Sequence, residues 1–201
     1  MAEDKQYIQG LDEYIRQGEP QEQERGRAWQ TAIGLQEVDG LKTSPYLLET
    51  ARRHIEGDIT ISEAKQLIDS YYKSQAGRKE IEGERTEEAD KVSARITELL
   101  QEKTFNFSPA QLTSIHRRLF EGIYKFAGRI RDYNITKQEW VLRGETVYYA
   151  SADTISETLE YDMGQERNYS YEGKSIDEAI SHLPRFCAYI WQIHAFGEGD
   201  T

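Results

Sequence analysis

The chain has 201 residues, of which 37% are hydrophobic and 30% are charged, and its formal net charge at pH 7 is −11. A strongly acidic chain is repelled by phosphate backbones and anionic lipid surfaces, which argues against general binding to nucleic acid or to a membrane. The single cysteine, Cys187, cannot form an internal disulfide, and no apolar stretch approaches the roughly 20 residues that span a bilayer, so we expect a cytoplasmic protein.

Helix signals begin near the N-terminus. Residues 2–17 and 20–37 are polar with scattered apolar positions, and we expect a helix in each range. Ser44 followed by Pro45 is typical of an N-cap with proline at the first helical position, and Gly57 supplies a C-terminal stop. These signals predict a third helix between Ser44 and Gly57.

Two capping boxes predict further helix starts. Residues 60–63 (TISE) fit a box in which a hydroxyl and a carboxylate satisfy free N–H groups, and residues 108–111 (SPAQ) fit a second box with proline at the first helical position. Between them we expect a long charged helix over residues 80–102. The small and polar residues 74–79 mark the best internal domain boundary.

The sequence changes in character over residues 128–150, where β-branched and aromatic residues surround an Arg-Gly-Glu turn. This pattern predicts a β-hairpin. Ser151 then offers an N-cap for a helix that extends to about residue 164. A third capping box at residues 175–178 (SIDE) opens a helix with a wide apolar stripe, so we expect that helix to be central in the core, with Cys187 as a buried thiol.

The end of this last helix combines groups that can carry out chemistry. His194 follows the apolar stripe, and an imidazole there can serve as a general base. Phe196 would anchor the following loop, while Gly197 and Gly199 permit backbone angles that gather N–H groups into an anion-binding nest. Glu198 adds a carboxylate of the kind that holds Mg²⁺ beside substrate phosphates. Together these are the parts of a phosphoryl or nucleotidyl transfer site.

A plainer interpretation of the same residues is a satisfied core histidine, followed by a helix-ending glycine loop with a surface carboxylate. Spacing alone favours this interpretation, because short motifs produce false positives. The other histidines, His54, His116 and His182, show no ligand spacing to one another, and we expect them to be ordinary helix residues.

Residues 194–201 (HAFGEGDT) resemble the start of the Fic motif, whose family pattern is His-Pro-Phe-x-(Asp/Glu)-Gly-Asn-Gly-Arg. Four positions match the pattern: His194, Phe196, Glu198 and Gly199. Ala195 replaces the proline, Asp200 replaces the asparagine, and Thr201 replaces the following glycine. Upstream, residues 124–131 (YKFAGRIR) are similar to the aromatic-Ala-Gly-x-x-Arg segment of the same family.

The resemblance implies a protein adenylyltransferase that uses ATP and Mg²⁺. His194 would deprotonate a Ser, Thr or Tyr hydroxyl of a target protein, which attacks the α-phosphate of ATP. Glu198 would hold Mg²⁺, and Gly199, Asp200 and Thr201 would form the anion hole. The family also has an Arg directly after this point, so we expect the 201-residue chain to be weak or inactive and to be a fragment of a longer gene product.

The predicted hairpin resembles the flap with which the family aligns its target chain by strand addition. Three aromatic residues are candidates for target docking: Trp140, Tyr148 and Tyr149. A solvent-exposed hairpin without a ligand fits the same residues, and we expect at least two of the three to be packing residues.

Residues 32–72 are similar to the VbhA-like antitoxin domain, whose inhibitory helix carries Ser/Thr-x-x-x-Glu-Gly. Here Leu35 stands at the hydroxyl position, and Asp39 and Gly40 replace the Glu-Gly pair. The resemblance implies a regulatory role for Asp39 and Gly40. A plain helix-ending turn explains them equally well.

The predicted fold is therefore mainly α: a Fic-type helical bundle with one β-hairpin flap over residues 76–201, preceded by a small helical antitoxin-like domain over residues 1–75. The alternative function is a catalytically dead regulatory module of toxin–antitoxin type, and a narrower alternative is transfer of another phosphate-containing group. The expected partners are ATP and a target protein hydroxyl, with self-association left open.

Overall fold

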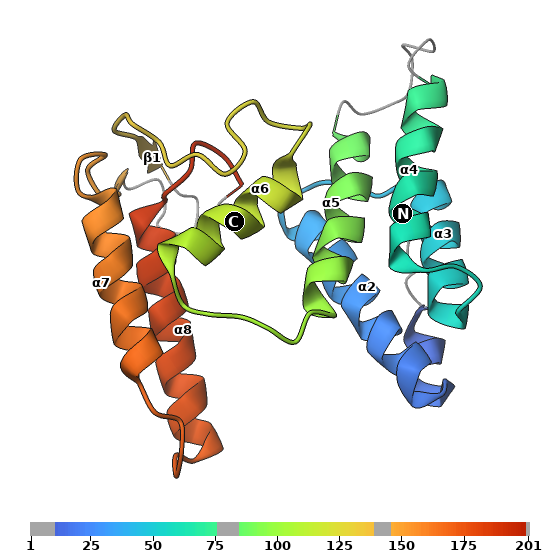
Figure 1. Cartoon of the computed structure of the whole chain (residues 1–201), viewed down its shortest axis with the longest axis horizontal. Coiled ribbons are helices and arrows are strands. Elements are labelled where there is room, and N and C mark those ends of the chain that lie inside the picture. Colours follow the sequence, from blue (N-terminus) through green and yellow to red (C-terminus); the bar gives the residue numbers. More distant parts are fainter. Residues whose placement is uncertain (1–10, 76–84, 139–145, 200–201) are drawn as a thin grey trace. The chain divides into compact units, whose positions relative to one another are not determined.

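The computed structural model describes residues 11–75, 85–138 and 146–199. These residues are mainly helical and include a two-stranded antiparallel sheet, which confirms the predicted fold class (Figure 1). The chain divides into two compact units, residues 1–103 and 104–201. Each unit has a hydrophobic core of its own.

The regular secondary structure among the described residues of the first unit is helical. Residues 11–17 are helical, and the labelled helices that follow are α2 (Pro20–Val38), α3 (Pro45–Glu56), α4 (Ile61–Gln75) and α5 (Thr86–Leu100). Helix α2 packs against α3 and α5, and α4 packs against α3 and α5. The large side chains of Trp29, Leu47, Ile55 and Ile68 are buried where these helices meet.

The helix ends of the first unit follow the predicted caps. The Ser44 hydroxyl accepts a hydrogen bond from the Leu47 amide at 3.0 Å, and Gly57 ends α3 in the left-handed conformation with φ 88°. Thr60 and Glu63 form the predicted capping box, because each side chain accepts a bond from the other residue's amide. Local sequence signals therefore set these boundaries.

Helix α5 belongs with the first compact unit, whereas the predicted boundary near residue 75 would have placed it in the second domain. It packs along both α2 and α4. Its buried residues include Ala89, Val92 and Ala94, whose small size allows the neighbouring helices to approach closely. The assignment of residues 1–75 and 76–201 to two functional domains stays a prediction.

A buried carboxylate on α5 contacts two other helices of the first unit. Asp90 is fully buried and accepts hydrogen bonds from the Ser44 amide at 2.8 Å, from the Ser44 hydroxyl at 2.5 Å and from the Tyr72 hydroxyl at 2.6 Å. Burial raises the pKa of Asp90, and the three hydrogen bonds oppose that shift. Asp90 therefore links α5 to the start of α3 and to α4.

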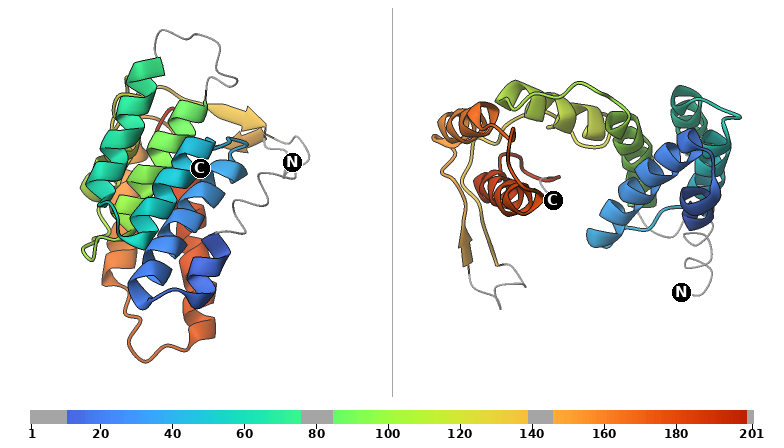
Figure 2. Two further views of the ribbon diagram at one scale, coloured as in Figure 1. Left: turned by 90° about the vertical axis from the view of Figure 1, so that its right-hand side faces the viewer. Right: turned by 90° about the horizontal axis from the view of Figure 1, so that it is seen from below.

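The second unit contains α6 (Pro109–Phe120), β1 (Thr136–Gln138), β2 (Thr146–Tyr148), α7 (Ile155–Asn168) and α8 (Ile176–Ile193). The strands pair antiparallel with Lys137 opposite Val147, as the predicted hairpin requires, and its predicted Arg-Gly-Glu turn lies outside the described residues. Helices α7 and α8 lie side by side (Figure 2). Ile155, Leu159 and Ile193 are among the buried residues of the core between them.

Helix α7 begins later than predicted. Its first residue is Ile155, and the residue before it is Thr154. The Ser151 hydroxyl instead contacts the Asp153 carboxylate at 2.7 Å, while the Thr154 amide donates to the Ser151 carbonyl. Ser151 therefore starts a turn and does not cap the helix, and α7 continues to Asn168, beyond the predicted end near residue 164.

Helix α8 starts at the predicted capping box of Ser175 and Glu178, but the expectation that it is central in the core is wrong. Ile176 is 78% exposed and Ile180 is 64% exposed, and Cys187, predicted to be buried, is exposed. A single neighbouring helix can cover only one side of a wide apolar stripe, and α7 is the helix that packs along α8 among the described residues. Within residues 11–75, 85–138 and 146–199, no helix combines the length and the apolarity needed to cross a membrane.

We predict that Asp90 makes the stability of the protein fall as the pH rises above the ordinary carboxyl pKa of 3.8. The folded-state pKa is raised, so the folded protein keeps a proton there that the unfolded chain has already released, and unfolding becomes easier across that window. The measurement is urea denaturation at several pH values, comparing the protein with Asp90→Asn. As the pH rises, the unfolding free energy of the protein should fall relative to that of Asp90→Asn. A relative increase would show that the hydrogen bonds lower the pKa of Asp90 by more than burial raises it.

Candidate active site

His194 lies directly at the C-terminal end of α8. It caps the helix in the left-handed conformation, with φ 50° and ψ 65°, and its amide donates to the Trp191 carbonyl. The residue is 4% exposed, and its ring stacks on Tyr149 with a centroid distance of 4.5 Å. Tyr149 also meets the Trp191 ring edge-on at 5.8 Å. The position of the His194 imidazole is therefore set both by the end of α8 and by the residue that follows β2.

The Arg131 side chain secures the same helix end. It is 4% exposed, and its Nε donates to the His194 carbonyl at 2.7 Å while a terminal nitrogen donates to the Ile193 carbonyl at 3.2 Å. The guanidinium also donates to the carbonyls of Tyr133, before β1, and Ala150, after β2. The last carbonyls of a helix have no partner within it, and here one guanidinium satisfies two of them and ties both ends of the hairpin to α8.

Phe196 anchors the loop after His194, as the sequence predicted. It is 2% exposed and belongs to the core cluster that contains Ile193 and Leu159. Its ring stacks on the His116 ring of α6, with a centroid distance of 3.7 Å and an interplanar angle of 16°. The loop is therefore held against α6 by a buried aromatic contact.

His116 connects three segments, and the expectation that it is an ordinary helix residue misses this. It is 3% exposed; its Nδ1 accepts a hydrogen bond from the Gly128 amide at 2.7 Å, and its Nε2 lies 2.9 Å from the Glu198 carbonyl oxygen. Burial lowers the pKa of His116, and the bond to Glu198 raises it by a smaller amount. No spacing signal in the sequence links His116 to the loop, because the two are 82 positions apart.

The two glycines of the loop pack closely against aromatic residues. Gly199 has φ 81°, and a methyl group there would lie 2.5 Å from a carbon of the Phe120 ring. A methyl group at Gly197 would lie 2.5 Å from the Tyr133 hydroxyl oxygen. The sequence predicted glycine here for its backbone freedom; the structure adds that there is no room for a side chain.

Glu198 is exposed, so its carboxylate can reach a ligand in solvent. The described part of the chain contains no group of three or more His, Cys, Asp or Glu side chains that could enclose a metal. Mg²⁺ needs only one or two protein carboxylates when substrate phosphates and waters supply the other ligands. The donor chemistry of Glu198 therefore fits a magnesium ion that arrives with a phosphorylated substrate.

Some of the remaining predicted site residues lie outside the described residues, and the two tyrosines at the end of the hairpin differ in exposure. Asp200, Thr201 and Trp140 lie outside the described residues. Tyr148 is 78% exposed, while its neighbour Tyr149 packs against His194 and Trp191. Consecutive residues of an extended chain point to opposite sides, which explains the difference.

Asp39 and Gly40 form a helix-ending turn in the first unit. Gly40 has φ 73° and its amide donates to the Glu37 carbonyl, while the Leu41 amide donates to the Gln36 carbonyl. This pair of bonds is the Schellman motif that ends many helices. The turn interpretation therefore accounts for the local geometry of both residues, and the inhibitory role stays a prediction.

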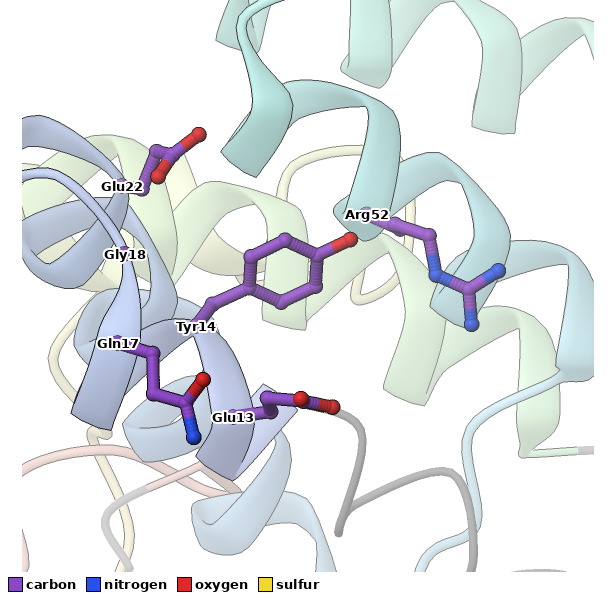
Figure 3. Close-up of a pocket in the computed structure, with 6 residues that line it drawn as sticks. All are labelled: Glu13, Tyr14, Gln17, Gly18, Glu22 and Arg52. Atoms are coloured by element: carbon purple, nitrogen blue, oxygen red, sulfur yellow. The ribbon is translucent and has the colours of Figure 1, made fainter.

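A surface cavity of about 440 Å³ lies in the first unit (Figure 3). Its lining includes Tyr14, Glu22 and Arg52, and the Tyr14 hydroxyl donates to the Glu56 carboxylate. Burial and, to a smaller extent, this bond raise the pKa of Tyr14 to about 12. None of these residues was a predicted site residue.

We predict that Gly199→Ala destabilises the second unit by about 2–5 kcal/mol, because it adds both left-handed backbone strain and a clash with Phe120. Gly122→Ala is the matched control, since Gly122 has φ 77° but open space around it, and should cost only about 1–2 kcal/mol. Urea denaturation of both variants measures the difference. Equal losses would contradict the close packing of the loop.

Residues 106–201 match the family model described as Fic/DOC family. No curated protein and no solved structure was found to match the chain. The matched range contains α6, the hairpin, α7, α8 and the loop after His194. The match therefore supports a Fic domain in residues 106–201 of this chain.

Proposed function

We propose that residues 104–201 form a protein adenylyltransferase, which transfers AMP from ATP to a Ser, Thr or Tyr hydroxyl of a target protein. The match to the Fic/DOC family, known for AMPylation-type transferases, supports this reaction class. The observation that carries the proposal is that His194 and the Glu198 loop are adjacent and are both held in place by buried side chains, Arg131 and His116.

In the proposed reaction, His194 accepts the proton of the target hydroxyl. The hydroxyl oxygen forms a bond to the α-phosphorus of ATP, the bond between that phosphorus and the oxygen leading to the β-phosphate breaks, and pyrophosphate leaves. The Arg131 bond to the His194 carbonyl and the stacked Tyr149 ring restrict the position of the imidazole. This restriction keeps the base oriented before the target arrives.

The loop after His194 would receive the triphosphate. Backbone N–H groups of a glycine-rich turn can bind phosphate oxygens, and we assign this role to residues 199–201. Glu198 would hold a Mg²⁺ ion that arrives with ATP, and that ion would neutralise phosphate charge when bound. The acidic net charge of the chain makes such a local device necessary for binding an anion.

The hairpin would bind the target segment by strand addition. In the two-stranded sheet of the described residues each strand has one strand neighbour, and the other edge of such a strand can pair with an extended peptide. We assign side-chain contact with the target to the exposed Tyr148 and a packing role to Tyr149. A docking role for Trp140 stays part of the proposal.

For residues 1–75, we propose an antitoxin-like regulatory role, with Asp39 and Gly40 at the inhibitory position. The resemblance of residues 32–72 to the VbhA-like domain supports it. We place the reaction in the cytoplasm, which agrees with a chain whose single cysteine is free.

We predict that His194→Asn lowers transfer of label from ATP by at least about 100-fold, since general-base catalysis contributes that much or more. Asn is the informative substitution because it tolerates the left-handed backbone of position 194, whereas Ala would add strain. The assay uses the protein with ATP labelled at the α-phosphate. Unchanged labelling of target or of the protein itself would eliminate a reaction based on His194.

A matched control distinguishes a specific role of the Glu198 carboxylate from the effect of removing any acidic group. Glu198→Gln should weaken labelling, while Glu172→Gln, an exposed carboxylate in the same unit, should leave it unchanged. Parallel reactions with label on the γ-phosphate distinguish AMP transfer from transfer of another phosphate group. No labelling of the unsubstituted protein or of a target in any of these reactions would favour the inactive regulatory module.

A further inference from the structure

His116 is the buried side chain that joins α6 to the loop proposed to bind phosphate. Its two ring nitrogens contact backbone groups of two distant segments, the Gly128 amide at 2.7 Å and the Glu198 carbonyl oxygen at 2.9 Å. Its ring face is covered by Phe196 at a centroid distance of 3.7 Å. Both polar atoms and one face of the ring are therefore used, and the orientation of the imidazole is fixed.

These contacts select one tautomer of the ring. The Gly128 amide is a donor, so Nδ1 must be the bare, accepting nitrogen. Nε2 must then carry the hydrogen in the neutral ring, and it donates that hydrogen to the Glu198 carbonyl. The Gly128 bond therefore determines which hydrogen His116 offers to the loop.

The hydrogen bond from His116 to the Glu198 carbonyl fixes the orientation of the whole peptide unit between Glu198 and Gly199. A peptide unit is planar and trans, so the carbonyl of one residue and the amide of the next point in opposite directions. When the Glu198 carbonyl points at His116, the Gly199 N–H must point away from His116. Gly199 is the first residue of the proposed phosphate-binding backbone, and its φ of 81° continues the turn.

We infer that His116 is a positioning residue for the proposed transfer reaction: by holding the Glu198 carbonyl, it aims the Gly199 N–H toward the bound phosphates. This inference rests on the proposed function for its phosphate ligand. Its geometric part, the tautomer and the direction of one peptide plane, does not depend on whether transfer occurs.

Three substitutions of His116 each keep a different subset of the contacts that its ring makes. His116→Gln can place an amide NH₂ near the position of Nε2 and keep the donor to Glu198. His116→Asn can place its carbonyl oxygen near the position of Nδ1 and keep only the acceptor for Gly128. His116→Phe keeps the stacking on Phe196 and removes both hydrogen bonds.

We predict that His116→Asn and His116→Phe raise the KM for ATP about tenfold, the loss expected for one hydrogen bond, while His116→Gln stays close to the unsubstituted protein. A role in stability alone would make Gln and Asn equivalent in KM, because each keeps one bond. Urea denaturation of all three variants provides the stability comparison. Equal KM values for Gln and Asn would overturn the inference.

A second measurement needs no activity. Long-range ¹H–¹⁵N correlation spectra of the unsubstituted protein should show His116 with hydrogen on Nε2 and a bare Nδ1. Hydrogen exchange at the Gly199 amide should change in His116→Asn but not in His116→Gln. Hydrogen on Nδ1 would overturn the inference even if transfer is observed, whereas an absence of transfer with the expected tautomer would contradict only the proposed function.

Discussion

The second unit depends on one buried guanidinium at the end of α8. Arg131 donates to the carbonyls of Ile193 and His194, which the helix leaves without partners, and to carbonyls at both ends of the hairpin. A buried charge is costly unless its donors are satisfied, and here backbone carbonyls satisfy them. Because of this contact, α8 can end in a left-handed histidine, and that residue stays at a defined distance from the hairpin.

Residues 195–199 form no helix or strand, so their order must come from contacts with other elements. Phe196 supplies a buried ring, His116 supplies a hydrogen bond to Glu198, and Phe120 closes the space beside Gly199. All three contacts come from or involve α6. A loop held this way can present an exposed carboxylate and oriented amides without reorganising when a ligand binds, which is what catalysis by preorganised groups requires.

Local signals in the sequence predicted much of the fold. The caps at Ser44 and Ser175 and the hairpin are set by residues near each other in the chain, and the structure confirms them. The burial of α8 was predicted wrongly because an apolar stripe shows what a helix can bury and not which neighbours cover it. His116 was missed for a related reason: its partners are 12 and 82 positions away, and no local pattern encodes such a contact.

The most direct test of the account is to map where the protein binds a nucleotide. A non-hydrolysable ATP analogue with Mg²⁺, added to the ¹⁵N-labelled protein, should shift the amide signals of residues 194–199 in a saturable way. Saturable shifts confined to the first unit, for example around Tyr14 and Arg52, or no shifts at all, would contradict the claim that the loop after His194 is a phosphate-binding site.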